Sequence, residues 1–178
     1  GTVILNPGIY SPNRDISISS GVTLEGSGIF TAVIDFVGGP YSINIVGSDE
    51  YVTGTVDVTQ DSTAVVGHST AWTVDMIGQG ILIDGDWYGV EDVLSATSIT
   101  LDSAFSGVDQ SGLSYVIATV NTGCELSKMT VQNSSSSLVY ARYSASTKLS
   151  LLNVSTGNIG IDIQDHVSST ISDFYISD

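Results

Sequence analysis

The sequence has few positive charges: four Lys and Arg residues stand against 19 Asp and Glu residues, giving a formal net charge of −15. Nucleic acids and anionic lipid surfaces attract proteins through clustered cations, so this balance argues against either as a partner. The acidity itself has two interpretations. It keeps a repetitive surface soluble, or it serves the binding of cations or neutral sugars.

Cysteine is nearly absent. Cys124 is the one cysteine, so no internal disulfide stabilises the chain. It precedes an apolar–polar alternation, which predicts a buried small hydrophobic residue. The sequence shows no signal peptide, transmembrane run or lipid-attachment motif, and we expect no membrane insertion. Because the chain begins without Met and ends on a strand-like stretch (174–178), we expect a fragment of a longer protein.

Amphipathic helical stretches of normal length are missing, and charged residues make up only 13% of the chain. Gly, Ser, Thr, Val and Ile dominate, a composition that favours short strands joined by tight turns. We therefore expect an all-β protein.

The last third of the chain carries a repeat. LSKMTV, LSLLNV and ISDFYI begin at residues 126, 149 and 171, so one pattern recurs after 23 and then 22 residues. LVY at 138–140 recurs as IDI at 161–163, again 23 residues later. Apolar and polar residues alternate within each copy, which is the period of a strand. Two strands per 22–23 residues predict successive rungs of a right-handed single-stranded parallel β-helix.

Stacking of these rungs predicts which side chains form the core. The expected inward residues are Leu126, Met129, Val131, Leu138, Tyr140, Leu149, Leu152, Val154, Ile161, Ile163, Ile171, Phe174 and Ile176.

The rhythm is interrupted between two parts of this β-helix. We expect the first rungs over 1–50, an inserted module over 51–118, and about three resumed rungs over 119–178. Strands in the middle block are short, and Asp84-Gly85 between apolar alternations predicts a two-residue hairpin turn. Such strands favour a small antiparallel barrel or sandwich. An insertion of this kind costs little, because it leaves from a surface turn and returns nearby.

Two stretches carry a resemblance to known families. A strand, the turn Pro7-Gly8-Ile9-Tyr10 and then VTLEGSG at 22–28 resemble the opening of pectate-lyase-like β-helix proteins, including bacteriophage tailspikes. The stretches 67–72, 78–90 and 97–101 resemble a small β module common in phage tail and tailspike proteins. The resemblance implies a structural and receptor-binding protein of a phage tail, commonly a homotrimer, that recognises a host cell-surface polysaccharide. Such a protein acts in the virion tail or otherwise outside the cell.

Two other functions remain open on the sequence. A polysaccharide depolymerase of the pectate-lyase-like class, hydrolase or lyase, fits the same resemblance, and so does an extracellular adhesin. Whether the chain is an enzyme is therefore undecided.

The 23-residue step predicts one candidate site on the β-helix wall. It places Arg142 over Asp165 and Tyr143 over His166, with Asp162 beside them. This cluster offers a sugar-binding surface, and Asp162 and Asp165 are candidate catalytic carboxylates for glycoside hydrolysis. The alternative is a surface ion pair between Arg142 and Asp165, worth under ~1 kcal/mol, with His166 as a turn residue.

Further candidates lie outside that cluster. Trp87, next to a turn, is a candidate for stacking on a glycan, whereas Trp72 is expected in the core of the inserted module. Calcium has a weak signal at Asp84 with Asp86, or at Asp162 with Asp165, because two carboxylates make a poor site. We expect no other cofactor. His68 lacks partner ligands, and no metal site is expected there.

Overall fold

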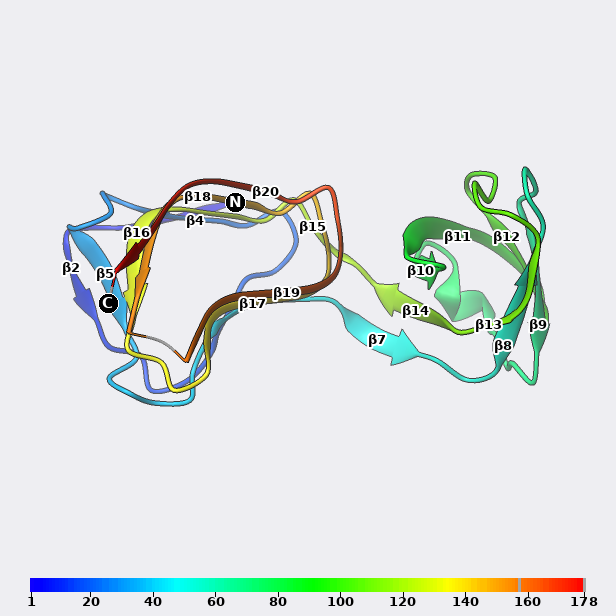
Figure 1. Cartoon of the computed structure of the whole chain (residues 1–178), viewed down its shortest axis with the longest axis horizontal. Coiled ribbons are helices and arrows are strands. Elements are labelled where there is room, and N and C mark those ends of the chain that lie inside the picture. The colour runs from blue at the N-terminus through cyan, green and yellow to red at the C-terminus, as the bar shows by residue number, and fades with distance from the viewer. Residues whose placement is uncertain (157, 178) are drawn as a thin grey trace. The chain divides into compact units, whose positions relative to one another are not determined.

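The computed structural model describes residues 1–156 and 158–177, and the chain divides into two compact units (Figure 1). The first contains Gly1–Gly47 and the chain from Asn121 onward, and the second contains Ser48–Val120. Both are built from strands, with one short 3-10 turn at Val74–Met76. Among the described residues, no helix is long and apolar enough to span a bilayer.

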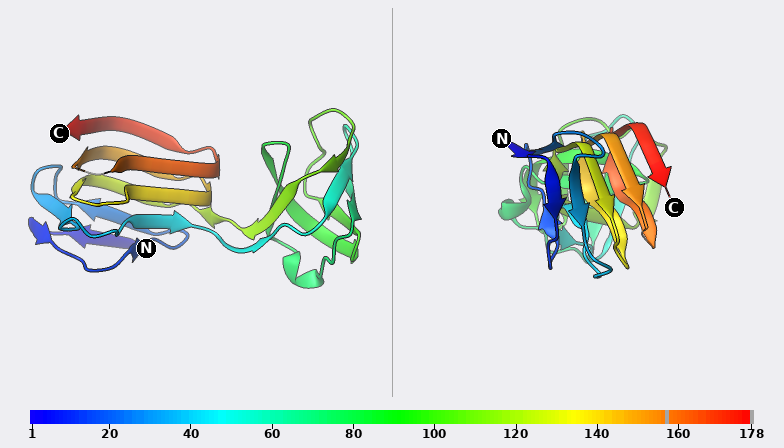
Figure 2. Two further views of the ribbon diagram at one scale, coloured as in Figure 1. Left: turned by 60° about the horizontal axis from the view of Figure 1, so that its bottom comes forward. Right: turned by 90° about the vertical axis from the view of Figure 1, so that its left-hand side faces the viewer.

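The first unit is a right-handed parallel β-helix, and its strands stack in parallel, one rung on the next (Figure 2). One ladder runs in the order β1-β4-β16-β18-β20. Its strands are β1 (Thr2–Leu5), β4 (Thr23–Gly26), β16 (Glu125–Gln132), β18 (Lys148–Ser155) and β20 (Thr170–Ser177). Strands before and after the inserted residues thus pair directly, since Leu24 lies opposite Leu126.

The long strands of this ladder bend and so form two walls. The first half of β16 pairs with β4, but its second half pairs with β5 (Ala32–Asp35), which itself pairs with β2 (Gly8–Tyr10). The bend lies at Lys128, which has a left-handed φ of 57°. The equivalent residues of the next two rungs, Leu151 and Asp173, have the same conformation, so each rung turns at the same place.

A separate parallel sheet forms the third wall. It runs in the order β15-β17-β6-β3, with β19 on the other side of β17. Its strands are β3 (Ile16–Ser17), β6 (Ile43–Val46), β15 (Asn121–Thr122), β17 (Ser137–Ala145) and β19 (Ile159–Val167).

The register of the third wall corrects one expectation. Val139 lies opposite Ile161 and Tyr140 opposite Asp162, so the step between these strands is 22 residues rather than 23. Val139 is consequently buried in the core, whereas Tyr140 points outward, contrary to the prediction that it faces inward. The reason is that the turn between β18 and β19 is one residue shorter than the 23-residue step requires.

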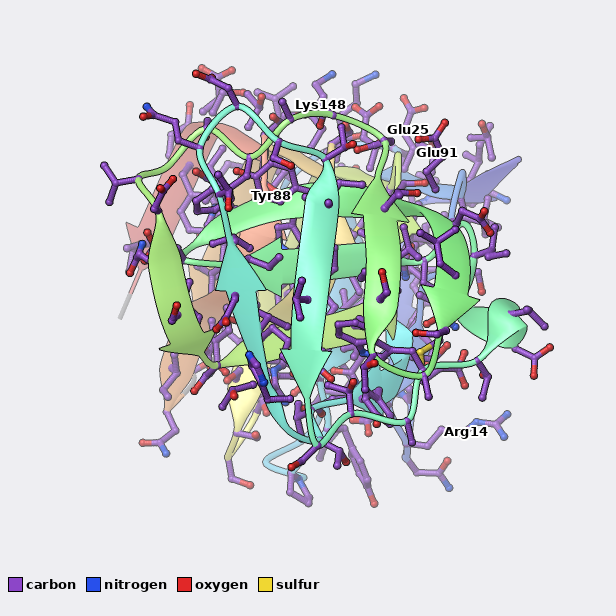
Figure 3. All side chains as sticks on the ribbon, turned by 90° about the vertical axis from the view of Figure 1, so that its right-hand side faces the viewer. Arg14, Glu25, Tyr88, Glu91 and Lys148 are labelled. Carbon is purple, nitrogen blue, oxygen red and sulfur yellow. The ribbon has the colours of Figure 1, made fainter. Side chains whose placement is uncertain are left out.

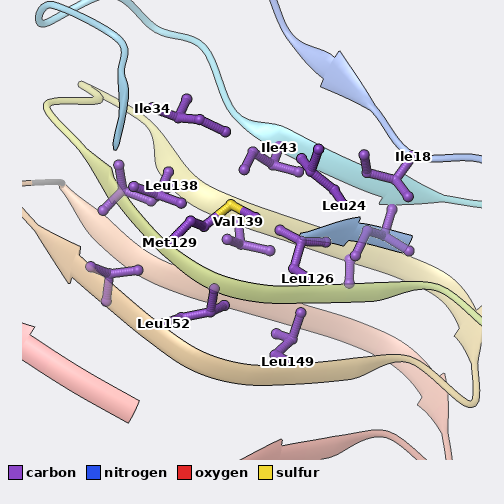
Figure 4. Close-up of a cluster of buried hydrophobic side chains, with 14 of the residues drawn as sticks. Ile18, Leu24, Ile34, Ile43, Leu126, Met129, Leu138, Val139, Leu149 and Leu152 are labelled. Carbon is purple, nitrogen blue, oxygen red and sulfur yellow. The ribbon is translucent and has the colours of Figure 1, made fainter. Parts of the chain in front are cut away.

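Inward side chains from all three walls form one hydrophobic core (Figure 4). Seven of the predicted inward residues are buried: Leu126, Met129, Val131, Leu138, Leu149, Leu152 and Val154. On the last described rungs, fewer neighbouring side chains cover the inward residues. Ile161, Ile163 and Phe174 are partly buried, while Ile171 and Ile176 are exposed.

Cys124 is buried in this core, as predicted, and donates to Oδ1 of Asn121 at 3.0 Å. Burial raises the pKa of its thiol, since the thiolate would lose its hydration. The cysteine is therefore a packing residue.

The second unit is an antiparallel sheet around its own core (Figure 3). The strand order is β13-β8-β9-β12-β11-β10-β14-β7. The strands are β7 (Ser48–Tyr51), β8 (Thr55–Val58), β9 (Ala64–His68), β10 (Gly80–Ile83), β11 (Asp86–Ser95), β12 (Ser98–Leu101), β13 (Gln110–Leu113) and β14 (Tyr115–Thr119). Ser48 lies opposite Thr119, so the chain enters and leaves this unit on neighbouring strands.

The hairpin predicted at Asp84-Gly85 is confirmed. Ile83 pairs with Asp86, and the two residues between them have φ values of 53° and 89°. Two successive left-handed residues form the turn whose twist matches that of the flanking strands.

Candidate functional site

A polar groove of about 400 Å³ lies on the outer surface of the third β-helix wall. Its lining includes Asp15, Ser42, Asn44, Tyr140, Asp162 and Gln164. We call it the wall groove. Nearly all of its lining side chains carry hydrogen-bonding groups, which suits a polar ligand.

Register brings the central residues of the wall groove together. Asn44, Tyr140 and Asp162 lie directly opposite one another on β6, β17 and β19. Neighbouring strands are about 4.8 Å apart, so one aromatic ring is flanked by an amide and a carboxylate at close range. Ile43 and Ile45, the strand neighbours of Asn44, are buried in the core and anchor its strand.

Hydrogen bonds hold the polar groups of the wall groove in place. The buried Ser42 hydroxyl donates to the carbonyl of Ser137, and the Ser42 backbone N–H donates to Oδ1 of Asp15 at 2.8 Å. Nε2 of Gln164 donates to both carboxylate oxygens of Asp162 at 3.2 Å. Each carboxylate keeps lone pairs for further donors, so the groove is preorganised for hydroxyl groups.

The predicted Arg142 cluster is only partly assembled. Nε of Arg142 lies 3.2 Å from Oδ2 of Asp165, so the expected ion pair forms. In register, however, Arg142 lies opposite Gln164, and Ser144 rather than Tyr143 lies opposite His166. The prediction of Tyr143 over His166 is therefore wrong, and the cause is again the 22-residue step.

Tyr143 does not present an aromatic face. Its residue is 2% exposed, and the guanidinium carbon of Arg142 lies 4.3 Å from the centre of its ring. Tyr143 and Asp165 are both left-handed, with φ of 49° and 48°, at a bend of the wall. This bend carries the Asp165 carboxylate towards Arg142, and His166 beyond it is exposed.

Trp87, the candidate of the second unit, is partly buried. It lies opposite Leu82, and its ring covers Gly80, where an added Cβ would come within 2.9 Å of the ring. The ring is thus positioned by close packing on a glycine. Trp72 is in the core, as predicted, and donates its Nε1–H to the Tyr115 hydroxyl at 2.9 Å. Burial raises the pKa of Tyr115.

His68 contacts a carboxylate. Its Nε2 lies 2.7 Å from Oδ2 of Asp57, whose Oδ1 accepts a hydrogen bond from the Gly112 N–H. The hydrogen bond to His68 and that from Gly112 lower the pKa of Asp57. Within residues 1–156 and 158–177, no group of three or more His, Cys, Asp or Glu side chains is placed to hold a metal ion.

Most of the wall groove was missed by sequence reasoning, which named only Asp162. Tyr140 was expected in the core, and Asp15, Asn44 and Gln164 were not singled out. A 22-residue step applied to 140 and 162 is the signal that finds the Tyr140–Asp162 pair.

Comparison with known proteins places the fold. No protein-family model and no curated protein matches the sequence. Among solved structures, the tailspike gp61 of Pseudomonas phage phi297 matches 96% of this chain with a TM-score of 0.67 and 11% identity. The Gp54 tailspike of Acinetobacter baumannii bacteriophage AP22, solved in complex with A. baumannii capsular saccharide, matches 92% with a TM-score of 0.55 and 12% identity. Tailspike gp49 of Pseudomonas phage LKA1 matches 98% with a TM-score of 0.53 and 19% identity.

The fold is that of phage tailspike β-helices. The chain spans about a third of those tailspikes, 32%, 32% and 37% of their respective lengths. The match covers nearly all of this chain, so it includes both the β-helix and the inserted unit.

Proposed function

We propose that this chain is part of a tailspike-like virion protein and that its wall groove binds a host cell-surface polysaccharide. The wall groove is the observation that carries this proposal. Tyr140 offers a ring for stacking on a pyranose, and Asn44, Asp162 and Gln164 offer donors and acceptors for its hydroxyls. On a parallel wall, outward side chains of successive strands lie one strand spacing apart, so they form a row that suits an extended chain of sugars.

The similarity to tailspikes supports the proposal, because one of them is solved with capsular saccharide. By the same similarity, the full-length protein is proposed to be a homotrimer in the virion tail. The net charge of −15 is compatible with this class of ligand, since a neutral polysaccharide needs no clustered cations.

The test is binding of the protein to an array of bacterial surface polysaccharides, with Tyr140→Ala and Asn44→Ala as groove variants. We expect both to weaken binding at least tenfold, because stacking and hydrogen bonds are lost. Tyr175→Ala is the matched control, since Tyr175 is exposed on a different wall. Thermal melting checks that each variant folds.

Two other outcomes would redirect or refute the proposal. Loss of binding with Trp87→Ala alone would move the site to the second unit. Binding unaffected by Tyr140→Ala and Asn44→Ala would reject the wall groove.

Hydrolysis of the bound polysaccharide is a second candidate function, favoured by one observation. Asp15 and Asp162 both line the wall groove, and glycoside hydrolysis uses two carboxylates on either side of the scissile bond. New reducing ends released by the wild type, and not by Asp162→Asn, would establish it. Asp165, the other candidate carboxylate, is paired with Arg142.

A further inference from the structure

We infer that the wall groove selects an uncharged stretch of polysaccharide and discriminates against uronate, sulfate or phosphate groups. This inference rests on the proposed function and names the class of saccharide. Its first support is the lining itself. The charged side chains among the lining residues are the carboxylates of Asp15 and Asp162, and no Lys or Arg lines the groove. An anionic sugar would meet two like charges without a compensating cation.

The positions and partners of the Lys and Arg residues also support the inference. All four Lys and Arg residues belong to the first unit, and none lies within residues 48–120. Lys128 and Lys148 pair with Glu25 and Glu125 at the ladder of β4, β16 and β18, away from the third wall. Arg14 precedes Asp15 in the chain, and its side chain is not part of the lining.

Arg142 is the cation placed to change this selectivity. It is two residues after Tyr140 on β17 and lies opposite the groove residue Gln164, so it borders the groove on the same outer face. Asp165 holds its guanidinium at 3.2 Å, and the guanidinium lies over the Tyr143 ring. The pair therefore keeps the positive charge of Arg142 engaged within the wall.

The charge of the lining also affects which cleavage reaction the wall groove can support. A lyase acting on uronates must neutralise the substrate carboxylate while a base removes the adjacent proton, and a cation is one group that does so. The charged groups that line the wall groove are carboxylates instead. The lining therefore favours hydrolysis of neutral residues over elimination on uronates.

The experiment uses matched polysaccharides. Acidic bacterial surface polysaccharides are immobilised in their native form and after chemical reduction of the uronate carboxyl to a neutral hydroxymethyl group, alongside neutral polysaccharides. We expect the wild type to bind neutral and carboxyl-reduced forms, with at least tenfold weaker binding to the native acidic forms. Equal or stronger binding to the native acidic forms would overturn the inference while leaving the proposed function intact.

Two variants test the role of the ion pair. Asp165→Asn removes the carboxylate that pairs with Arg142. We expect the ratio of affinities for the carboxyl-reduced and native polysaccharides to fall about three- to tenfold. Asp173→Asn is the matched control, because it makes the same charge change on a different wall and should leave the difference unchanged. A discrimination that Asp165→Asn leaves as in the wild type would refute the role of Arg142. Absence of binding to every polysaccharide would instead reject the proposed function, and the selectivity with it.

Discussion

Left-handed backbone conformations recur at equivalent residues of successive rungs. Lys128, Leu151 and Asp173 form one such column, and Tyr143 with Asp165 forms another. For residues other than Gly, Asn and Asp, this conformation costs about 1 kcal/mol or more of folding free energy. The β-helix accepts that cost at Lys128 and Leu151, where the rungs turn. The benefit is that walls stay in register, and the second column also brings Asp165 to Arg142.

Close approach between rungs decides where a side chain is excluded. A Cβ at Gly26 would lie 2.9 Å from Cβ of Met129 and closer still to the carbonyl oxygen of Lys128. We expect Gly26→Ala to lower the free energy of unfolding by about 1–3 kcal/mol, because a backbone atom must move. Gly160→Ala is the control, since its nearest neighbour is Cγ2 of Val154 at 3.5 Å. Denaturant melts of both variants measure the difference, and equal stabilities would contradict it.

Asp35, at the end of β5, makes a contribution to folding stability that depends on pH. Desolvation raises the pKa of this carboxyl, but hydrogen bonds from Asn133, Gln132 and the Val37 N–H outweigh it, so the pKa lies below its ordinary 3.8. A lowered folded-state pKa stabilises the fold above pH 3.8, and that contribution is lost as pH falls through the folded value. We expect the wild type to lose more stability than Asp35→Asn between pH 5 and pH 2.

The measurement is a series of thermal melts across that range. Gln132→Met removes one of the donors and should reduce the acid sensitivity in part. If the melting temperatures of the wild type and Asp35→Asn fall equally with pH, the carboxyl makes no pH-dependent contribution to stability.

At the scale of the element, the bend of a β-helix strand decides which side chain faces solvent, since β16 and β18 each expose the residue at the bend between buried neighbours. In β18 the bend places two adjacent leucines in opposite environments: Leu151 is 36% exposed and Leu152 is fully buried. The repeat predicted Leu152 and not Leu151 to face inward, and this prediction is confirmed. The left-handed φ of Leu151 turns it outward.

Leu152→Ala should therefore lower the free energy of unfolding by about 2–5 kcal/mol, since it leaves a cavity between rungs. Leu151→Ala removes the same atoms from the surface, and we expect a change within about 0.5 kcal/mol. Urea melts of the two variants provide the comparison. A similar loss in both would mean that the bend does not expose Leu151 in solution.

At the scale of the whole molecule, the inserted unit is separable in the chain. Its first strand, β7, pairs with its last strand, β14, so Ser48 and Thr119 are neighbours. The β-helix strands on either side of the insertion pair with each other without it, as Leu24 does with Leu126. Each unit also has its own hydrophobic core.

Excision of residues 48–120 should consequently leave a folded β-helix. We expect a variant in which a short Gly-Ser link joins residues 47 and 121 to retain its β-sheet circular dichroism and a cooperative melt. Polysaccharide binding should also persist, because every lining residue of the wall groove belongs to the first unit. Loss of binding in a variant that still melts cooperatively would assign the ligand to the second unit.

The sequence by itself determined the fold class, the repeat, seven of the core residues of the resumed rungs and the Asp84-Gly85 hairpin. These follow from local periodicity and turn chemistry, which are written in neighbouring residues. Only the tertiary structure determined which residues form the wall groove. Tyr140 meets Asn44 and Asp162 only through the register of β6, β17 and β19, and one residue of turn length moved that register from 23 to 22. Leu138 and Val139 are both buried, so β17 departs from simple alternation there and Tyr140, expected inside the core, lies on the surface.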